Sequence, residues 1–324
     1  MIAIDPVAEQ APLGGLERWL NNPGTNEVLV NNGGEIWIDR DGALQRVGTM
    51  STTALLAAIE RILMPTGRRV DRSSPMVDAR LPDGARVCAV IEPIATDGPC
   101  LAIRQFSRAA LSLAHFARPP VVQLLREVIL RRCNIVVTGA TSSGKTTLLA
   151  TLAAHTAHDE RLVALEDIAE LAIDHPHLLR LEARPATPDG VGAVSLADLL
   201  HTALRLRPDR LIVGEVRGSE AISLLQALNT GHDGSLSTVH ANSAHDGLAR
   251  LASLVLQASP SWPMAAIDEH VRRAVDVVVH VARDVAATRR VVAVDQVVAD
   301  GPALRTTPLA VGHDVVGRLT RGRR

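Results

Sequence analysis

Gly139-Ala140-Thr141-Ser142-Ser143-Gly144-Lys145-Thr146 is the stretch that decides the fold of this chain. The octapeptide fits the pattern GxxxxGK[ST], in which glycines let backbone N–H groups turn inward around phosphate groups. A short β-branched run, 133–138, precedes it, and a helical pattern, 147–154, follows it. A Gly/Ser-rich turn is the alternative, but strand, glycine loop and helix in this order favour a phosphate-binding loop. The sequence therefore predicts a nucleotide site here.

Lys145 is the only lysine in the 324 residues, although Lys and Arg together number 34. A GC-rich codon bias is the simplest reason for the excess of arginine, and one position has resisted it. A compact ammonium on a flexible stem reaches between β- and γ-phosphate, which a planar guanidinium does less well. The predicted nucleotide-binding residues are Gly139, Ala140, Thr141, Ser142, Ser143, Gly144, Lys145, Thr146 and Thr147.

Composition restricts the class of protein. An apolar content of 47% with 21% charged residues is typical of a globular chain with a large core. A net charge of −1 does not indicate a broad basic surface for nucleic acid. Cys88, Cys100 and Cys133 are widely spaced, which favours buried apolar residues in a reducing compartment.

No basic-then-apolar leader and no run of ~18 apolar residues is present, which predicts a cytoplasmic protein with at most peripheral membrane attachment. The terminal segment, Arg318–Arg324, is basic. We expect it to fray, and contact with anionic lipid is a second interpretation.

The order of apolar patterns predicts an α/β chain in two domains. Residues 1–106 mix strands with helical stretches and are interpreted as an N-terminal α+β domain for sensing and oligomerisation; 107–120 form a linker. In residues 121–324, apolar runs that predict strands alternate with helical patterns, which favours a mostly parallel sheet covered on both faces. A late helix near 267–274 and a β-rich tail over 275–281 and 290–298 complete the prediction.

Hydrolysis of a bound triphosphate needs a metal and a group that activates water. Thr146 is placed to coordinate Mg²⁺. Glu215 follows an apolar strand, 211–213, and we expect it to activate the water, although a solvated charge at a strand end is the alternative. Gly214 stands where many ATPases carry a metal-organising aspartate, so another residue must perform that task.

Two further segments supply candidates. Glu166 and Glu170 follow another apolar strand, 162–165, and we expect them to hold Mg²⁺ through water or to orient the attacking water; a solvated turn is the alternative. With Thr146, the predicted metal-binding set contains Glu166 and Glu215, both through water. His240 lies in a Gly/Ser/Thr-rich segment, 229–242, and we expect it to sense the γ-phosphate by hydrogen bonding.

These four segments, in this order, resemble the ATPases that drive type II and type IV secretion and type IV pili. The resemblance consists of a Walker A loop (139–146), an acidic box (166–170), a Walker B segment with Gly-Glu (213–217) and a histidine box (230–242). Within that superfamily, the chain is most similar to tight-adherence (Flp) pilus assembly ATPases, through the segments 78–84, 175–177, 180–182 and 229–242. The four-cysteine zinc module of the pilus-extension branch is absent from the sequence.

The resemblance implies a RecA-like ATPase domain over 121–324, with ATP and Mg²⁺ as cofactors. It also implies a homo-oligomer, a hexameric ring, that works with an inner-membrane platform protein at the cytoplasmic face of the membrane. In this family, arginines of the N-terminal domain approach the γ-phosphate, and the positions that fit are Arg86 and Arg104, with Arg80 as a third. A solvated strand arginine is the alternative for each of them.

Two other functions stay open at the level of sequence. A DNA-translocating ring would show hydrolysis that DNA stimulates with a steep salt dependence. The near-neutral charge and the scarcity of aromatic residues for base stacking argue against it, so DNA is not an expected partner. A scaffold that nucleotide switches without turnover is the other alternative, and the intact Lys145, Thr146 and Glu215 argue against it.

Overall fold

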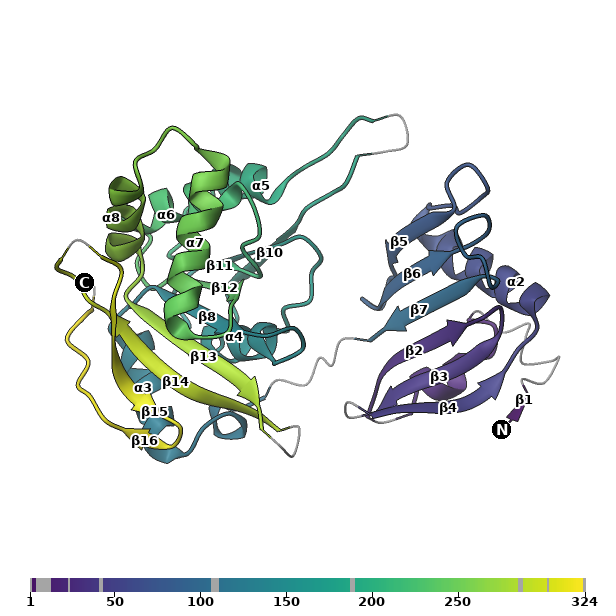
Figure 1. Ribbon diagram of the computed structural model, residues 1–324, viewed down its shortest axis with the longest axis horizontal. Helices are drawn as coiled ribbons and strands as arrows, with labels where there is room; N and C mark the ends of the chain where they lie inside the picture. The colour runs from purple at the N-terminus through teal and green to yellow at the C-terminus, as the bar shows by residue number, and fades with distance from the viewer. Residues whose placement is uncertain are drawn as a thin grey trace. The chain divides into compact units, whose positions relative to one another are not determined.

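The computed structural model describes residues 2–3, 13–22, 24–40, 43–105, 111–186, 190–284, 288–301 and 303–322. The chain folds as two compact units, residues 1–108 and 109–324 (Figure 1). The first four residues of the predicted linker, 107–110, lie outside the described residues. The rest of it contains a 3₁₀ turn, Leu113–His115, and the first residues of helix α3 (Pro119–Leu130). No helix among the described residues is long and apolar enough to cross a membrane.

The N-terminal unit is built on one antiparallel sheet, whose described strands number seven and lie in the order β1-β4-β3-β2-β7-β6-β5. Only β1 and β4 run parallel. The strands are β1 (Ile2–Ala3), β2 (Thr25–Asn31), β3 (Glu35–Arg40), β4 (Ala43–Thr49), β5 (Met76–Arg80), β6 (Arg86–Val90) and β7 (Cys100–Arg104). Alternate strand residues such as Val28, Val87 and Ile103 pack with helices α1 (Glu17–Leu20) and α2 (Thr52–Leu63) into one core.

The C-terminal unit is built on a nine-stranded sheet, counted over the described residues, in the order β10-β9-β11-β12-β8-β13-β14-β15-β16. The six strands from β10 to β13 in this order are parallel, and β14 to β16 extend them antiparallel. The strands are β8 (Ile135–Gly139), β9 (Leu162–Glu166), β10 (Leu178–Glu182), β11 (Arg210–Val213), β12 (Leu236–His240), β13 (Val277–Arg283), β14 (Arg289–Val297), β15 (Thr306–Val311) and β16 (Asp314–Val315).

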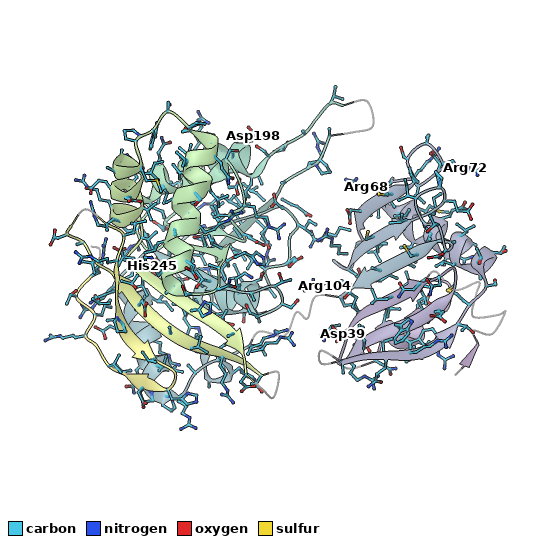
Figure 2. All side chains as sticks on the ribbon, viewed as in Figure 1. Asp39, Arg68, Arg72, Arg104, Asp198 and His245 are labelled. Carbon is cyan, nitrogen blue, oxygen red and sulfur yellow. The ribbon has the colours of Figure 1, made fainter. Side chains whose placement is uncertain are left out.

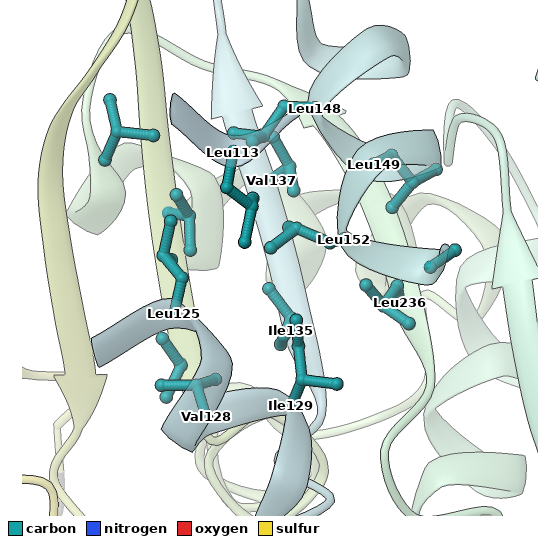
Figure 3. Close-up of a cluster of buried hydrophobic side chains, with 14 of the residues drawn as sticks. Leu113, Leu125, Val128, Ile129, Ile135, Val137, Leu148, Leu149, Leu152 and Leu236 are labelled. Carbon is teal, nitrogen blue, oxygen red and sulfur yellow. The ribbon is translucent and has the colours of Figure 1, made fainter. Parts of the chain in front are cut away.

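Helices cover both faces of this sheet, as the sequence predicts. Ile135 and Val137 of β8 pack with α3 and α4 (Lys145–Ala153), as Figure 3 shows. Val136 between them faces the opposite core. The helices of that opposite core are α5 (Leu196–Ala203), α6 (Glu220–Leu228), α7 (Ala244–Ala258) and α8 (Met264–Ala274). An α/β chain with an antiparallel N-terminal sheet and a mostly parallel second sheet is thus confirmed.

The expectation that Arg318–Arg324 frays is wrong for the part of this segment that the structure describes. Leu319 is buried, and the Arg321 guanidinium lies 2.7 Å from Oδ1 of the buried Asp276. Oδ2 of Asp276 accepts a hydrogen bond from the backbone N–H of Asn134, at the start of β8. A buried carboxylate needs a cation and hydrogen-bond donors, and the tail supplies the cation. The last two residues, 323–324, lie outside the described residues.

Candidate active site

The phosphate-loop pattern forms a tight turn between β8 and α4. A Cβ on Gly139 would lie 2.3 Å from the carbonyl oxygen of Val281, and one on Gly144 would lie 2.7 Å from Cδ of Arg289. Neither position has room for a side chain, and Gly144 also has a left-handed φ of 101°. The glycines therefore let neighbouring chain segments approach the loop, and the loop opens at the N-terminus of α4, where phosphate groups bind best.

Lys145 begins α4 and is almost completely buried. Its Nζ donates to the carbonyl oxygen of Ala140 over 2.8 Å and lies 3.4 Å from Nδ1 of His240. Burial lowers the pKa of the ammonium, and the charge of Glu215 opposes that shift. The lysine thus lies folded back over its own loop, with the predicted catalytic and sensing residues beside it.

Glu215 and His240 meet because β11 and β12 are neighbouring parallel strands that end at the same edge of the sheet. Nε2 of His240 lies 2.9 Å from Oε1 of Glu215, a close contact without hydrogen-bond geometry, and Arg217 donates to Oε2 over 2.5 Å. Burial lowers the pKa of His240, so the ring is neutral near pH 7. With Nδ1 facing the lysine ammonium, the arrangement favours the tautomer that carries its proton on Nε2. Lys145, His240 and Glu215 therefore form one polar chain.

Glu166 occupies the space that the missing side chain at Gly214 leaves. A Cβ on Gly214 would lie 3.0 Å from Cγ of Glu166. Glu166 ends β9 and is only 3% exposed; its Oε1 accepts 2.8 Å hydrogen bonds from the backbone N–H groups of Glu170 and Leu171. Burial raises the pKa of Glu166 to about 7, and these two hydrogen bonds oppose the shift. A carboxylate is thus present beside position 214, although it comes from another strand.

The residues around the loop fit a hydrated Mg²⁺ bound to a nucleotide. Oε2 of Glu166 and Oγ of Ser143 are buried, and neither atom has a hydrogen-bond partner among the described residues. Mg²⁺ prefers oxygen ligands and keeps several of its waters. The hydroxyl of Thr146 would bind the ion directly, and Glu166 and Glu215 would hold its waters. Among the described residues, no group of three or more His, Cys, Asp or Glu is placed to hold a metal ion.

The three arginines predicted to approach the γ-phosphate lie in one row across the N-terminal sheet. Strand register pairs Arg80 with Arg86, and Arg86 with Arg104. The same row continues to Glu27 and Asp39 on β2 and β3; Figure 2 labels Arg104 and Asp39. The role of these arginines toward the γ-phosphate stays a prediction.

Sequence reasoning missed three arginines that contact the site. Arg217 pairs with Glu215, and its place two residues after Glu215 in the same motif could have indicated this pair. Arg283 and Arg289 of the β13–β14 hairpin contact the phosphate loop more than 130 residues away in sequence, and no local pattern indicates that contact.

The pKa of Glu166 gives a prediction for stability. Between its ordinary value of 4.5 and about 7, the folded protein holds a proton that the unfolded chain has lost. The folded state is therefore destabilised by Glu166 as the pH rises through this window. We expect the melting temperature of Glu166→Gln, relative to that of the wild type, to increase from pH 5 to pH 8. The exposed Asp159→Asn change should show no such trend, and a constant Glu166→Gln difference would contradict the shifted pKa.

Comparison with known proteins identifies the family. Residues 9–320 match the family model described as "Type II/IV secretion system protein". A putative conjugal transfer protein of Mycobacterium tuberculosis is 40% identical over 288 residues, covering 85% of this chain and 81% of that protein. Type IV secretion system protein PtlH of Bordetella pertussis is 33% identical over 314 residues, covering 86% and 91%. The X-ray structure of the Legionella pneumophila ATPase DotB shares the fold, with a TM-score of 0.64 at 20% identity over 93% of this chain and 83% of that one. The predicted resemblance is confirmed: this chain belongs to the type II/IV secretion system protein family and is an ATPase of that family.

Proposed function

We propose that this chain is an Mg²⁺-dependent ATPase subunit of a hexameric ring that powers pilus assembly or type II/IV protein secretion. The observation that carries the proposal is the polar chain from Lys145 through His240 to Glu215, at the mouth of an intact phosphate loop. Such a chain links the residue that binds the γ-phosphate to the residue that activates water. The placement in the tight-adherence branch rests on motif similarity alone.

Binding of ATP draws the Lys145 ammonium away from Ala140 and toward the β- and γ-phosphates. The buried ammonium is suited to this task because its present hydrogen bond, to a neutral carbonyl oxygen, is weaker than one to a phosphate. When Lys145 moves away from His240, the imidazole can donate a hydrogen bond to the γ-phosphate or keep its contact with Glu215. His240 thereby reports the phosphate state.

Hydrolysis needs a base close to the γ-phosphate, and Glu215 lies at one end of the polar chain. Glu215 accepts the proton of a water whose oxygen forms a bond to the γ-phosphorus, while the bond to the bridging oxygen of ADP breaks. Arg217 holds one carboxylate oxygen and leaves the other on the His240 side. A bound Mg²⁺ would neutralise charge that develops on the phosphate oxygens. Glu166, whose ionised form that cation would favour, would orient water near it.

The motor part of the proposal concerns partners. Hydrolysis would move the two units of each subunit relative to one another, and an inner-membrane platform protein would take up this motion from the cytoplasmic face of the membrane. Two observations support this part of the proposal. The chain forms two compact units, and none of the described helices is able to span a membrane.

Substitution of the proposed base tests the chemistry. Glu215→Gln keeps the size and the polar contacts of the side chain but removes the proton acceptor. We expect ATP turnover to fall by ~100-fold or more, the usual contribution of a general base, while ATP binding persists. The matched control is Glu127→Gln on the exposed side of α3, which should hydrolyse ATP as the wild type does. Unchanged turnover in Glu215→Gln would refute the assigned role.

Substitution of the arginine row tests its contribution to the γ-phosphate. A guanidinium that stabilises the phosphoryl charge in the transition state contributes ~10³-fold or more to turnover. We therefore expect Arg86→Gln or Arg104→Gln to reduce the kcat for ATP while the affinity for ADP stays constant. Arg72, an exposed arginine of the same unit that Figure 2 labels, provides the control. Equal kcat in all three variants would assign the row a structural role.

Dilution tests the ring. If subunits complete one another's sites, the specific ATPase activity should fall as the protein is diluted, and mass measurement should show the oligomer dissociating over the same range. A monomer with constant specific activity at every concentration would contradict a ring motor and leave a self-sufficient ATPase.

A further inference from the structure

The β13–β14 hairpin contacts the phosphate loop through residues at the end of β13 and the start of β14. β13 pairs in parallel with β8, so that Val279 lies opposite Val137 and His280 opposite Thr138. Its next residues then reach the loop itself, where the carbonyl oxygen of Val281 excludes any side chain at Gly139. The hairpin thus contributes side chains to the phosphate loop from a distant part of the sequence.

Arg283, the last residue of β13, holds the middle of the loop. Its Nε donates to the carbonyl oxygen of Ser142 over 2.9 Å. Ser142 has a φ of 60°, which is uncommon for a residue with a side chain and must be held by its surroundings. The hydrogen bond turns this carbonyl toward the hairpin. It therefore helps to fix the turn in which loop N–H groups face the phosphates.

Arg289, the first residue of β14, reaches a different part of the loop. Its aliphatic stem crosses Gly144, where a Cβ would lie 2.7 Å from Cδ of the arginine. Its guanidinium then donates to the hydroxyl of Thr147 over 3.2 Å. Arg289 is half-buried, and its charged group lies beside the first turn of α4.

The position of Thr147 indicates which phosphate lies nearest. In loops of this pattern the lysine reaches the β- and γ-phosphates, the next hydroxyl binds Mg²⁺, and backbone N–H groups cradle the α- and β-phosphates. Thr147 is one residue beyond the hydroxyl of Thr146, and we expect it to lie on the α-phosphate side of the loop. The guanidinium that contacts Thr147 would then be a cation at the opposite end of the triphosphate from Lys145.

We propose that Arg289 binds an oxygen of the α-phosphate, and that Arg283 positions the loop without touching the nucleotide. A guanidinium has five N–H donors and can hold the Thr147 hydroxyl and a phosphate oxygen at the same time. This proposal depends on nucleotide binding at the phosphate loop, and the test below separates the two. Arg289 would bind ATP and ADP equally, because both carry the α-phosphate.

Chirality at the α-phosphorus provides the test. The two diastereomers of ADPαS place sulfur at one or the other α-oxygen, and sulfur is a poor acceptor for a guanidinium. Affinities are measured in EDTA, so that metal coordination does not contribute. We expect the wild type to prefer one diastereomer by ~10-fold or more. Arg289→Gln should bind ADP ~10- to 100-fold more weakly, the range for a hydrogen bond to a charged group, and should bind both diastereomers alike.

Neighbouring residues provide matched controls. Arg290 follows Arg289 in β14 and pairs with Asp284 over 2.8 Å, so Arg290→Gln should keep both the affinity and the diastereomer preference. Arg283→Gln should weaken ADP binding and keep the preference. If Arg289→Gln does not fold, Arg289→Lys, which keeps the charge and loses the fork, should show a reduced preference.

Three results would overturn the assignment. If Arg289→Gln (or Arg289→Lys in its place) keeps the full diastereomer preference, the side chain only packs on Gly144. A wild-type protein that binds ADP without any preference would exclude a directional contact to the α-phosphate. Failure of the wild type to bind ADP at all would instead contradict the nucleotide site itself, a result distinct from the other two.

Discussion

The burial of a single ammonium group is the constraint on which this active site depends. Lys145 is almost fully enclosed at the start of α4, and a buried cation needs an acceptor and a nearby negative charge. Ala140 supplies the acceptor, and Glu215 supplies the charge through the neutral imidazole of His240. Three strand ends, those of β8, β11 and β12, must lie at one edge of the sheet to bring these groups together. The parallel sheet therefore serves the charge arrangement of the site.

The same edge explains how the chain functions without an aspartate at position 214. The carboxylate of Glu166 enters from β9 and lies against Gly214, where any side chain would meet it. Its raised pKa has burial as the main cause, so a nearby divalent cation would favour the ionised form. An acid on one strand and a glycine on its neighbour thus form a single feature of the site.

Much of this arrangement could be predicted from the sequence, because the motifs are local. The phosphate loop, the strands before Glu166 and Glu215, and the two-sided sheet follow from short apolar runs and glycine positions. Several elements were missed, among them β1, β4, α7 and β15, and for β1 and β4 the physical reason is clear. β4 is largely exposed and polar, so it lacks the alternation that predicts a strand, and β1, with which it pairs in parallel, lies far from it in sequence. The tail is ordered by the partner of Arg321, the buried Asp276, which is distant in sequence. Arg289 was missed in the same way, since only the folded hairpin brings it to Thr147.

The side-chain nitrogen signals of His240 test the polar chain most directly, with His240→Asn used to assign them. The account predicts a neutral ring near pH 7 that carries its proton on Nε2 in the nucleotide-free protein. A non-hydrolysable ATP analogue should shift these signals strongly because the γ-phosphate draws Lys145 away, whereas ADP should shift them less. An imidazolium at pH 7, or equal responses to ADP and the ATP analogue, would contradict the proposal that His240 links Lys145 to Glu215 and reports the γ-phosphate.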